Sequence, residues 1–121
     1  MILLEPIPPE ISKKIGCHLP DGEEELLRVA TDLAPDGRYG TRWLVLTTER
    51  VLLVPPDGED GVVDLPVLEI SSARTEALVG GGRLEIERKA GAAVFVPYTA
   101  SLTVKFSEVA RGIEQLRKGE P

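Results

Sequence analysis

The chain has 121 residues, a formal net charge of −6 at pH 7 and 42% hydrophobic residues, which is typical of a single soluble globular domain. The acidic surplus disfavours nucleic acid as a partner and opposes direct docking on an anionic membrane. No apolar run approaches the roughly 20 residues of a membrane-spanning helix, so the sequence predicts neither a membrane span nor a signal peptide. The single cysteine, Cys17, cannot form an internal disulfide and is compatible with the cytoplasm, where we expect the protein.

Residues 1–20 are expected to form an N-terminal extension that contains one short helix. Two prolines precede the segment 10–15, and proline is favoured in the first turn of a helix. Ile11 and Ile15 lie four positions apart and therefore share one face of this helix. A turn at residues 20–22 leads into a predicted strand at residues 27–33, where larger apolar side chains alternate with smaller or polar ones.

Residues 43–46 and 51–54 are predicted to form a central pair of strands. The first of them is apolar on both alternating faces, as expected of a strand that is covered on each side. Glu49 and Arg50 form the polar break between the two strands. Residues 34–37 are a predicted turn, because Pro35 presets φ and Gly37 tolerates positive φ. Residues 55–61 combine two prolines, two glycines and three acids, and are predicted to be an exposed loop.

Further strands are predicted at residues 62–65, 67–78, 84–87 and 93–96, for a total of about seven. Residues 80–82 are three glycines, which predict a flexible hairpin loop. The last segment differs, because its apolar residues step by four and three positions, the pattern of one helical face. We expect this helix to seal one open end of a barrel and to stop at Gly119. Its apolar stripe consists of Leu102, Phe106, Val109, Ile113 and Leu116.

Short antiparallel strands followed by one amphipathic helix is the element order of a pleckstrin-homology-like (PH-like) domain. Residues 43–54 resemble the bacterial PH-like signature, in which a strand ends in Thr, a polar residue and Arg before an apolar strand. With residues 36–40 and 78–82 beside it, the pattern resembles the soluble N-terminal domain of certain bacterial ABC exporters. The resemblance predicts a mainly β, PH-like barrel or sandwich of about seven strands, capped by the C-terminal helix. We assign residues 21–118 to this domain.

The resemblance implies a non-enzymatic interaction or regulatory module, an accessory domain of a membrane ABC-type transporter. The expected partner is another protein or the rest of the transporter, with an indirect association at the inner face of the membrane and with no cofactor. The sequence departs from that of an exporter because it has no Walker A loop, no transmembrane helices and no second domain. If the resemblance to an exporter holds, the chain is expected to be a detached accessory domain.

No segment of the sequence predicts a catalytic or metal-binding residue. Cys17 and His18 are adjacent and project in divergent directions, and a structural zinc site needs about four such ligands. Cys17 is instead expected to be a small hydrophobe near the end of the first helix. Residues 80–82 could offer amides to a phosphate, but no helix and no Lys-Ser pair follow them. Residues 57–60 lack the spacing of a calcium loop and predict a solvated turn.

Arg38, Arg42 and Arg50 are the candidate interaction residues, because they lie near the central hairpin and suit an acidic partner or a lipid headgroup. Surface salt bridges with neighbouring acids are the simpler interpretation of all three. In eukaryotic PH domains, phosphoinositides bind the loop between the first two strands, and residues 34–38 hold only one arginine and one aspartate there. A module that binds a membrane surface or an anionic ligand is therefore the alternative hypothesis, and an enzyme is the third. Clustering of the three arginines on one exposed face would favour the alternative.

Overall fold

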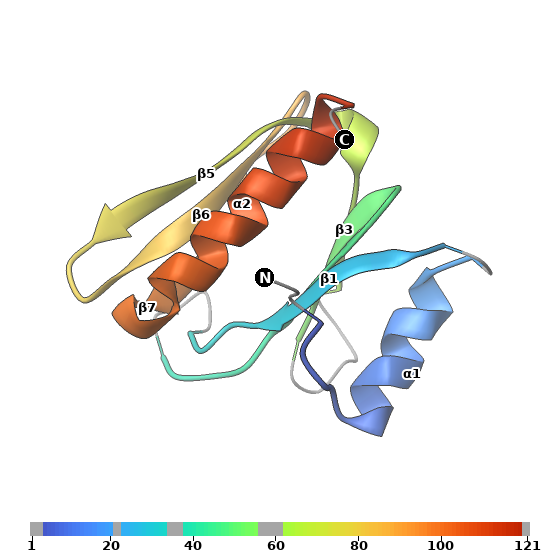
Figure 1. The fold of residues 1–121 in the computed structure, drawn as a ribbon, viewed down its shortest axis with the longest axis horizontal. Coiled ribbons are helices and arrows are strands. Elements are labelled where there is room, and N and C mark those ends of the chain that lie inside the picture. The colour runs from blue at the N-terminus through green and yellow to red at the C-terminus, as the bar shows by residue number, and fades with distance from the viewer. Residues whose placement is uncertain (1–3, 21–22, 34–37, 56–61, 120–121) are drawn as a thin grey trace.

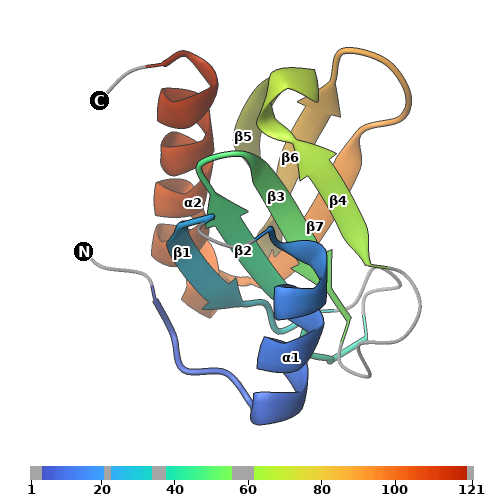
Figure 2. The same ribbon diagram turned by 90° about the vertical axis from the view of Figure 1, so that its right-hand side faces the viewer.

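The computed structural model describes residues 4–20, 23–33, 38–55 and 62–119. All strand pairs are antiparallel, and they form a four-stranded sheet β1-β2-β3-β4 and a three-stranded sheet β5-β6-β7 (Figures 1 and 2). The elements in chain order are α1 (Pro9–His18), β1 (Glu25–Ala30), β2 (Trp43–Thr47), β3 (Arg50–Val54), β4 (Val63–Pro66), a 3₁₀ turn η1 (Val67–Glu69), β5 (Ile70–Leu78), β6 (Gly81–Arg88), β7 (Val94–Thr99), a 3₁₀ turn η2 (Ala100–Leu102) and α2 (Thr103–Arg117).

The main core lies between the two sheets and α2, as the apolar stripe of the C-terminal segment predicts. Phe106, Val109 and Ile113 are fully buried, and the two ends of the stripe are partly buried against the same core. Phe106 stacks on Tyr98 of β7 with 4.6 Å between the ring centroids and 5° between the ring planes. Gly119 follows the helix with a φ of 72°, which confirms the predicted stop.

The first sheet is covered on both faces, which confirms the prediction for residues 43–46. All five residues of β2 are buried, and the first four alternate between two clusters. Leu44 and Leu46 face the main core, whereas Trp43 and Val45 pack with Ile11 and Ile15 of α1. Figure 1 accordingly shows the strands of this sheet between the two helices. The N-terminal extension is therefore a third layer on the sheet.

Three predictions about the fold need correction. Within the described part of the chain no closed barrel forms, because the strands pair in two separate sheets. The predicted strand at 67–78 begins only at Ile70, since η1 follows Pro66 and turns the chain from one sheet into the other. The predicted strand at 27–33 ends at Ala30. Thr31 still donates its amide to the Arg42 carbonyl at 2.8 Å, but Asp32 turns away to bind β7.

Cys17 is also placed differently from the prediction. It lies near the end of α1 but is exposed, because it follows Ile15 by two residues and so falls on the other side of the helix. The predicted turn at 34–37 and residues 56–61 of the predicted acidic loop lie outside the described residues.

Candidate functional site

Arg50 anchors the β2–β3 turn. Thr47, at the end of β2, is fully buried, and its hydroxyl accepts hydrogen bonds from the amides of Glu49 and Arg50 at 3.1 and 3.0 Å. The same hydroxyl donates to the carboxylate of Glu23 at 2.6 Å. Local bonds of this kind let a threonine side chain replace backbone partners in a tight turn. Thr47 and Arg50 therefore build this turn together with Glu23.

The guanidinium of Arg50 is fully engaged at this turn. Its Nε and Nη2 donate to the two carboxylate oxygens of Glu23 at 2.9 and 3.1 Å, and Nη1 donates to Asp64 at 3.0 Å. The hydrogen bond to Glu23 is the main cause that raises the pKa of Arg50. Burial alone would raise the pKa of Glu23, but the bonds from Arg50 and Thr47 together outweigh it and lower that pKa. The arrangement is an intramolecular clamp.

Arg42 lies at the opposite end of β2 and has a different environment. Its amide donates to the Thr31 hydroxyl at 3.1 Å, so its backbone belongs to the β1–β2 ladder. The Nε and Nη2 atoms are buried, and neither has a hydrogen-bond partner within the part of the chain that the structure describes. Burial lowers the pKa of Arg42 because desolvation disfavours the charged form. Nε and Nη2 form the edge of a guanidinium that binds carboxylate or phosphate in bidentate fashion.

The three candidate arginines are not brought together by the described contacts. Arg42 and Arg50 flank opposite ends of β2, and Arg38 is exposed beyond the Arg42 end. Arg50 forms salt bridges with the neighbouring acids Glu23 and Asp64, as the simpler interpretation predicts. No contact tests whether the three residues bind a partner, and that role stays a prediction. The described residues contain no group of three or more side chains suited to a metal ion, and no helix among them is long and apolar enough to cross a membrane.

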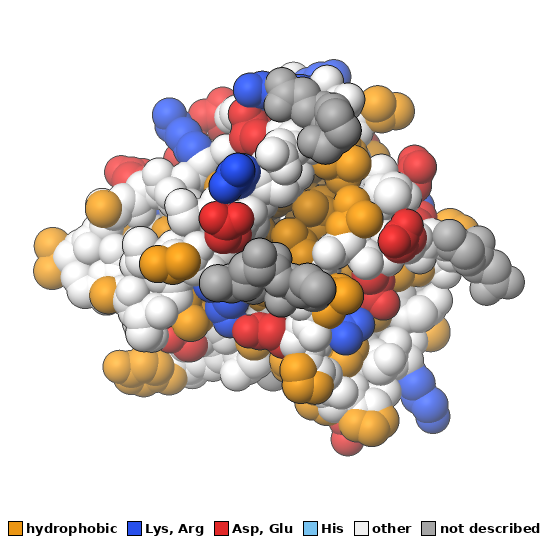
Figure 3. Space-filling model, viewed as in Figure 1, with side chains coloured by type: hydrophobic (Ala, Val, Ile, Leu, Met, Phe, Trp, Pro, Cys, Tyr) orange, Lys and Arg blue, Asp and Glu red, His pale blue; other side chains and the backbone are white. Residues whose placement is uncertain are grey.

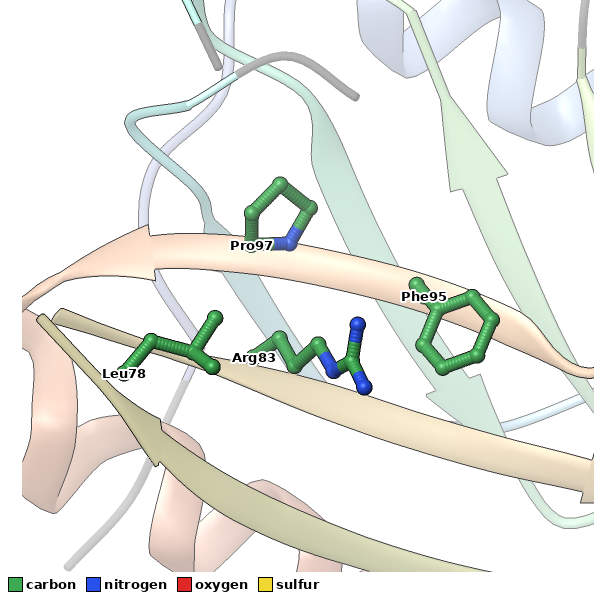
Figure 4. Close-up of a pocket in the computed structure, with 4 residues that line it drawn as sticks. All are labelled: Leu78, Arg83, Phe95 and Pro97. Carbon is green, nitrogen blue, oxygen red and sulfur yellow. The ribbon is translucent and has the colours of Figure 1, made fainter. Parts of the chain in front are cut away.

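A groove lies on the outer face of the β5–β6–β7 sheet, opposite the core. It has a volume of about 450 Å³ and is lined by Leu78, Arg83, Phe95 and Pro97 (Figure 4). The guanidinium carbon of Arg83 lies 4.6 Å from the centroid of the Phe95 ring, a cation–π contact. Nε and Nη2 of Arg83 also donate to Glu76 at 3.1 and 2.9 Å. Leu78 and Phe95 remain 45% and 42% exposed, so the groove has an apolar surface in contact with solvent.

The groove continues toward the tip of the β5–β6 hairpin. A second hollow of about 200 Å³ adjoins it, and Leu78 and Pro97 line both. Val79, in the turn, is fully exposed. In the space-filling view, hydrophobic side chains gather at the left end of the molecule, where this hairpin turns in Figure 1 (Figure 3). The second hollow is lined by Leu33, Leu78, Val79, Gly80, Gly81, Gly82, Pro97 and Tyr98.

The three glycines have different roles at this tip. The loop predicted at residues 80–82 is therefore shorter than expected. Only Gly80, with a φ of 79°, lies in the turn, whereas Gly81 and Gly82 are strand residues of β6. A Cβ on Gly81 would lie 2.2 Å from the Tyr98 carbonyl oxygen, and one on Gly82 would lie 2.8 Å from the Tyr98 hydroxyl. Gly81 therefore allows the β7 backbone to pass close to β6, and Gly82 leaves room for the Tyr98 side chain.

Sequence reasoning missed the groove, although its signal was present. In β7, Phe95 and Pro97 alternate with the buried Val96 and Tyr98. Strict alternation places a large apolar residue and a proline on the face away from the core. The strand itself was predicted, but the apolar surface on its outward face was not.

Comparison with known proteins supports the fold. No sequence profile of a known family matches the chain, and no curated protein matches it in sequence. Its structure is similar to that of a DUF1696 family protein with a pleckstrin-homology domain from Shewanella loihica PV-4. The TM-score is 0.65 at 14% sequence identity, over 90% of this chain and 98% of that one. The two antiparallel sheets with a C-terminal helix and a short N-terminal helix are thus consistent with a PH-like fold.

Proposed function

We propose that the chain is a non-enzymatic interaction module that binds a partner protein in the groove on the outer face of the β5–β6–β7 sheet. The observation that carries this proposal is the exposed apolar surface of Leu78 and Phe95 in a groove on the face opposite α2. A volume of about 450 Å³ falls within the range of binding clefts.

The lining of the groove selects an extended and mainly apolar segment. Its one cation among the described lining residues, Arg83, is neutralised by Glu76 and lies against Phe95. The remaining lining residues are apolar, so nothing in the groove favours a net charge on the ligand. An extended segment can place alternate side chains into such a surface.

We further propose that the partner is part of a membrane ABC-type transporter, so that the module lies in the cytoplasm at the inner face of the membrane. The support is the resemblance of residues 43–54, with residues 36–40 and 78–82, to the soluble domain of bacterial exporters. In this hypothesis the association with the membrane is indirect and runs through the transporter.

An anionic-ligand module is the second candidate, and Arg42 is the observation that favours it. A buried Nε and Nη2 pair without an acceptor among the described residues is suited to a carboxylate or a phosphate group. Titration calorimetry with inorganic phosphate tests this candidate. Binding that Arg42→Met abolishes, and that the exposed control Arg111→Met preserves, would support it, whereas binding that both variants retain would exclude Arg42.

Photocrosslinking in the native host tests the main proposal. Replacing Phe95 with benzoylphenylalanine keeps an aromatic ring in the groove, and the same replacement at Val104, which is 67% exposed on α2, is the matched control. We expect an adduct at position 95 alone, and mass spectrometry should identify it as a transporter subunit. A specific adduct with another protein would contradict the transporter hypothesis but would still support the groove as the binding site. Equal labelling at both positions would overturn the groove itself.

A further inference from the structure

Carboxylates from distant segments cap outward-facing amides on three of the sheet edges. The side chain of Glu5 accepts from Ala30 on β1 at 2.7 Å, and Asp32 accepts from Thr99 on β7 at 2.9 Å. Glu114 of α2 accepts from Ala73 on β5 at 3.0 Å. Unpaired edge strands can pair with other chains, and folded proteins commonly block them. These three carboxylates block β1, the end of β7 and the beginning of β5.

No carboxylate among the described residues caps the second half of β5 in this way. In an antiparallel ladder, outward-facing amides alternate along the strand, so the outward amide of Ala73 places those of Thr75 and Ala77 outward as well. Neither of these two amides has a hydrogen-bond acceptor within the described part of the chain. Residues 74–78 are all exposed. On β7, by contrast, Pro97 has no amide hydrogen and Asp32 occupies the amide of Thr99.

The charges along this edge are self-complementary in one register. On the outer face of β5, Arg74 and Glu76 flank Thr75 and are 65% and 49% exposed. If two copies of β5 pair antiparallel about Thr75, Arg74 of each copy lies opposite Glu76 of the other, and opposite charges in such pairs are stabilising. Pairing about Glu76 would place two glutamates face to face. Pairing about Ala77 would require Val79, which lies in the turn.

We propose that the exposed edge of β5 pairs with the same edge of a second copy of the chain, antiparallel and centred on Thr75. In this register, the Thr75 amide donates to the Thr75 carbonyl of the second copy, and the Ala77 amide donates to the Ala73 carbonyl. The Ala73 amide still donates to Glu114, so it cannot donate to the second copy, and the pairing ends at this residue. The inference goes beyond the proposed function, because it uses the strand edge and leaves the groove open.

Pairing at this edge has a consequence for the groove. The two three-stranded sheets become one six-stranded sheet, and a two-fold axis perpendicular to the sheet places both grooves on the same face. A partner with two apolar segments could then occupy both, and its apparent affinity would rise through effective concentration.

Two measurements on the unmodified chain test the association. Sedimentation equilibrium should show a monomer–dimer equilibrium, and hydrogen exchange followed by NMR should show protection of the Thr75 and Ala77 amides that increases with concentration. The Phe95 amide is the control, because the β6–β7 register also points it outward, on the edge of β7. Exchange at all three amides that is independent of concentration, together with a monomer mass at the highest concentration, would overturn the proposal.

Cysteine crosslinking tests the register. In a Cys17→Ser background, Thr75→Cys places two sulfurs on residues with Cα atoms about 5.5 Å apart, within disulfide reach. Ala77→Cys is the matched control, because its two copies lie four positions out of register, roughly 14 Å apart. We expect rapid disulfide dimers from Thr75→Cys alone. Equal rates for the two variants would overturn the register, and circular dichroism shows that each variant is folded.

Discussion

The two sheets differ in how many of their faces are covered. The first sheet has α1 on one face and the main core on the other, and all five residues of β2 are buried. The second sheet has the core and α2 on one face only, and β5 is exposed over residues 74–78. The same chain therefore contains a three-layer half and a two-layer half.

The difference shows which half is available for interaction. A strand that is apolar on both faces must be covered on both sides, and the described residues of β2 and most of β3 are accordingly buried. The outer face of the second sheet carries ion pairs, Arg74 with Glu85 at 2.9 Å and Arg83 with Glu76, and the groove lies beside them. We therefore expect substitutions of the buried residues of β2 and β3 to affect stability, and those on the outer face of the second sheet to affect binding.

Trp43 and Phe95 give the largest contrast between the sheets. Trp43→Ala should lower the free energy of unfolding by roughly 3–5 kcal/mol, because the ring is buried between β2 and α1. Phe95→Ala should cost less than about 1 kcal/mol, since its ring is 42% exposed, yet it should remove partner binding. Urea unfolding of both variants measures the difference. Equal losses of stability would contradict the contrast between the covered face of the first sheet at Trp43 and the exposed face of the second sheet at Phe95.

Gly82 tests whether the lack of a side chain on β6 makes room for the Tyr98 side chain and for the β5 backbone. Gly82→Ala places a Cβ 2.8 Å from the Tyr98 hydroxyl and 2.9 Å from the Glu76 carbonyl oxygen. Overpacking of this kind costs roughly 1–3 kcal/mol, which thermal unfolding can measure. Gly16→Ala is the control, because a Cβ at this helical position meets no described atom within 4 Å. A loss at Gly16 as large as that at Gly82 would contradict the steric explanation.

Much of the fold could be predicted from periodicity. The apolar stripe through Phe106 predicted α2. The apolar residues on both faces of residues 43–46 predicted a strand that is buried on both sides. The division into two sheets could not be predicted, because it depends on η1. A continuous strand and a strand broken after Pro66 have the same local alternation, and only packing against the core distinguishes them.

The candidate site was less predictable than the fold. Arg42 and Arg50 are chemically identical in the sequence, but one lacks described acceptors for two buried nitrogens and the other binds two carboxylates. The difference depends on Glu23, which precedes Arg50 by 27 positions and reaches it only through the fold. The groove likewise requires Leu78, Arg83 and Phe95 from three adjacent strands. Such juxtapositions depend on register, which single-sequence patterns do not give.

Arg50 tests whether the β2–β3 turn, with its Thr47, Glu23 and Arg50 contacts, stabilises the first sheet. Arg50→Ala leaves the carboxylate of Glu23, whose side chain is 4% exposed, without its main donor. The loss should be about 1–2 kcal/mol, moderated because the Arg50 side chain itself is 23% exposed. Chemical denaturation measures it. Arg38→Ala, on an exposed residue outside this turn, is the comparison, and an equal loss there would argue against a specific clamp.

Glu114→Gln should have the smallest effect on the free energy of unfolding. It tests the hydrogen bond by which Glu114 of α2 accepts from the Ala73 amide on the edge of β5. Its hydrogen bond from Arg117 is the largest cause that lowers its pKa, and the Ala73 amide adds to it. A lowered folded-state pKa contributes stability above the unfolded value of about 4.3, and this contribution is lost as the pH falls through the folded-state pKa. Glu114→Gln should therefore cost about 0.5–1 kcal/mol at neutral pH and progressively less in acid. If the difference in free energy of unfolding between Glu114→Gln and the unmodified chain stays constant from neutral to acidic pH, the charge of Glu114 does not stabilise its contacts with Ala73 and Arg117.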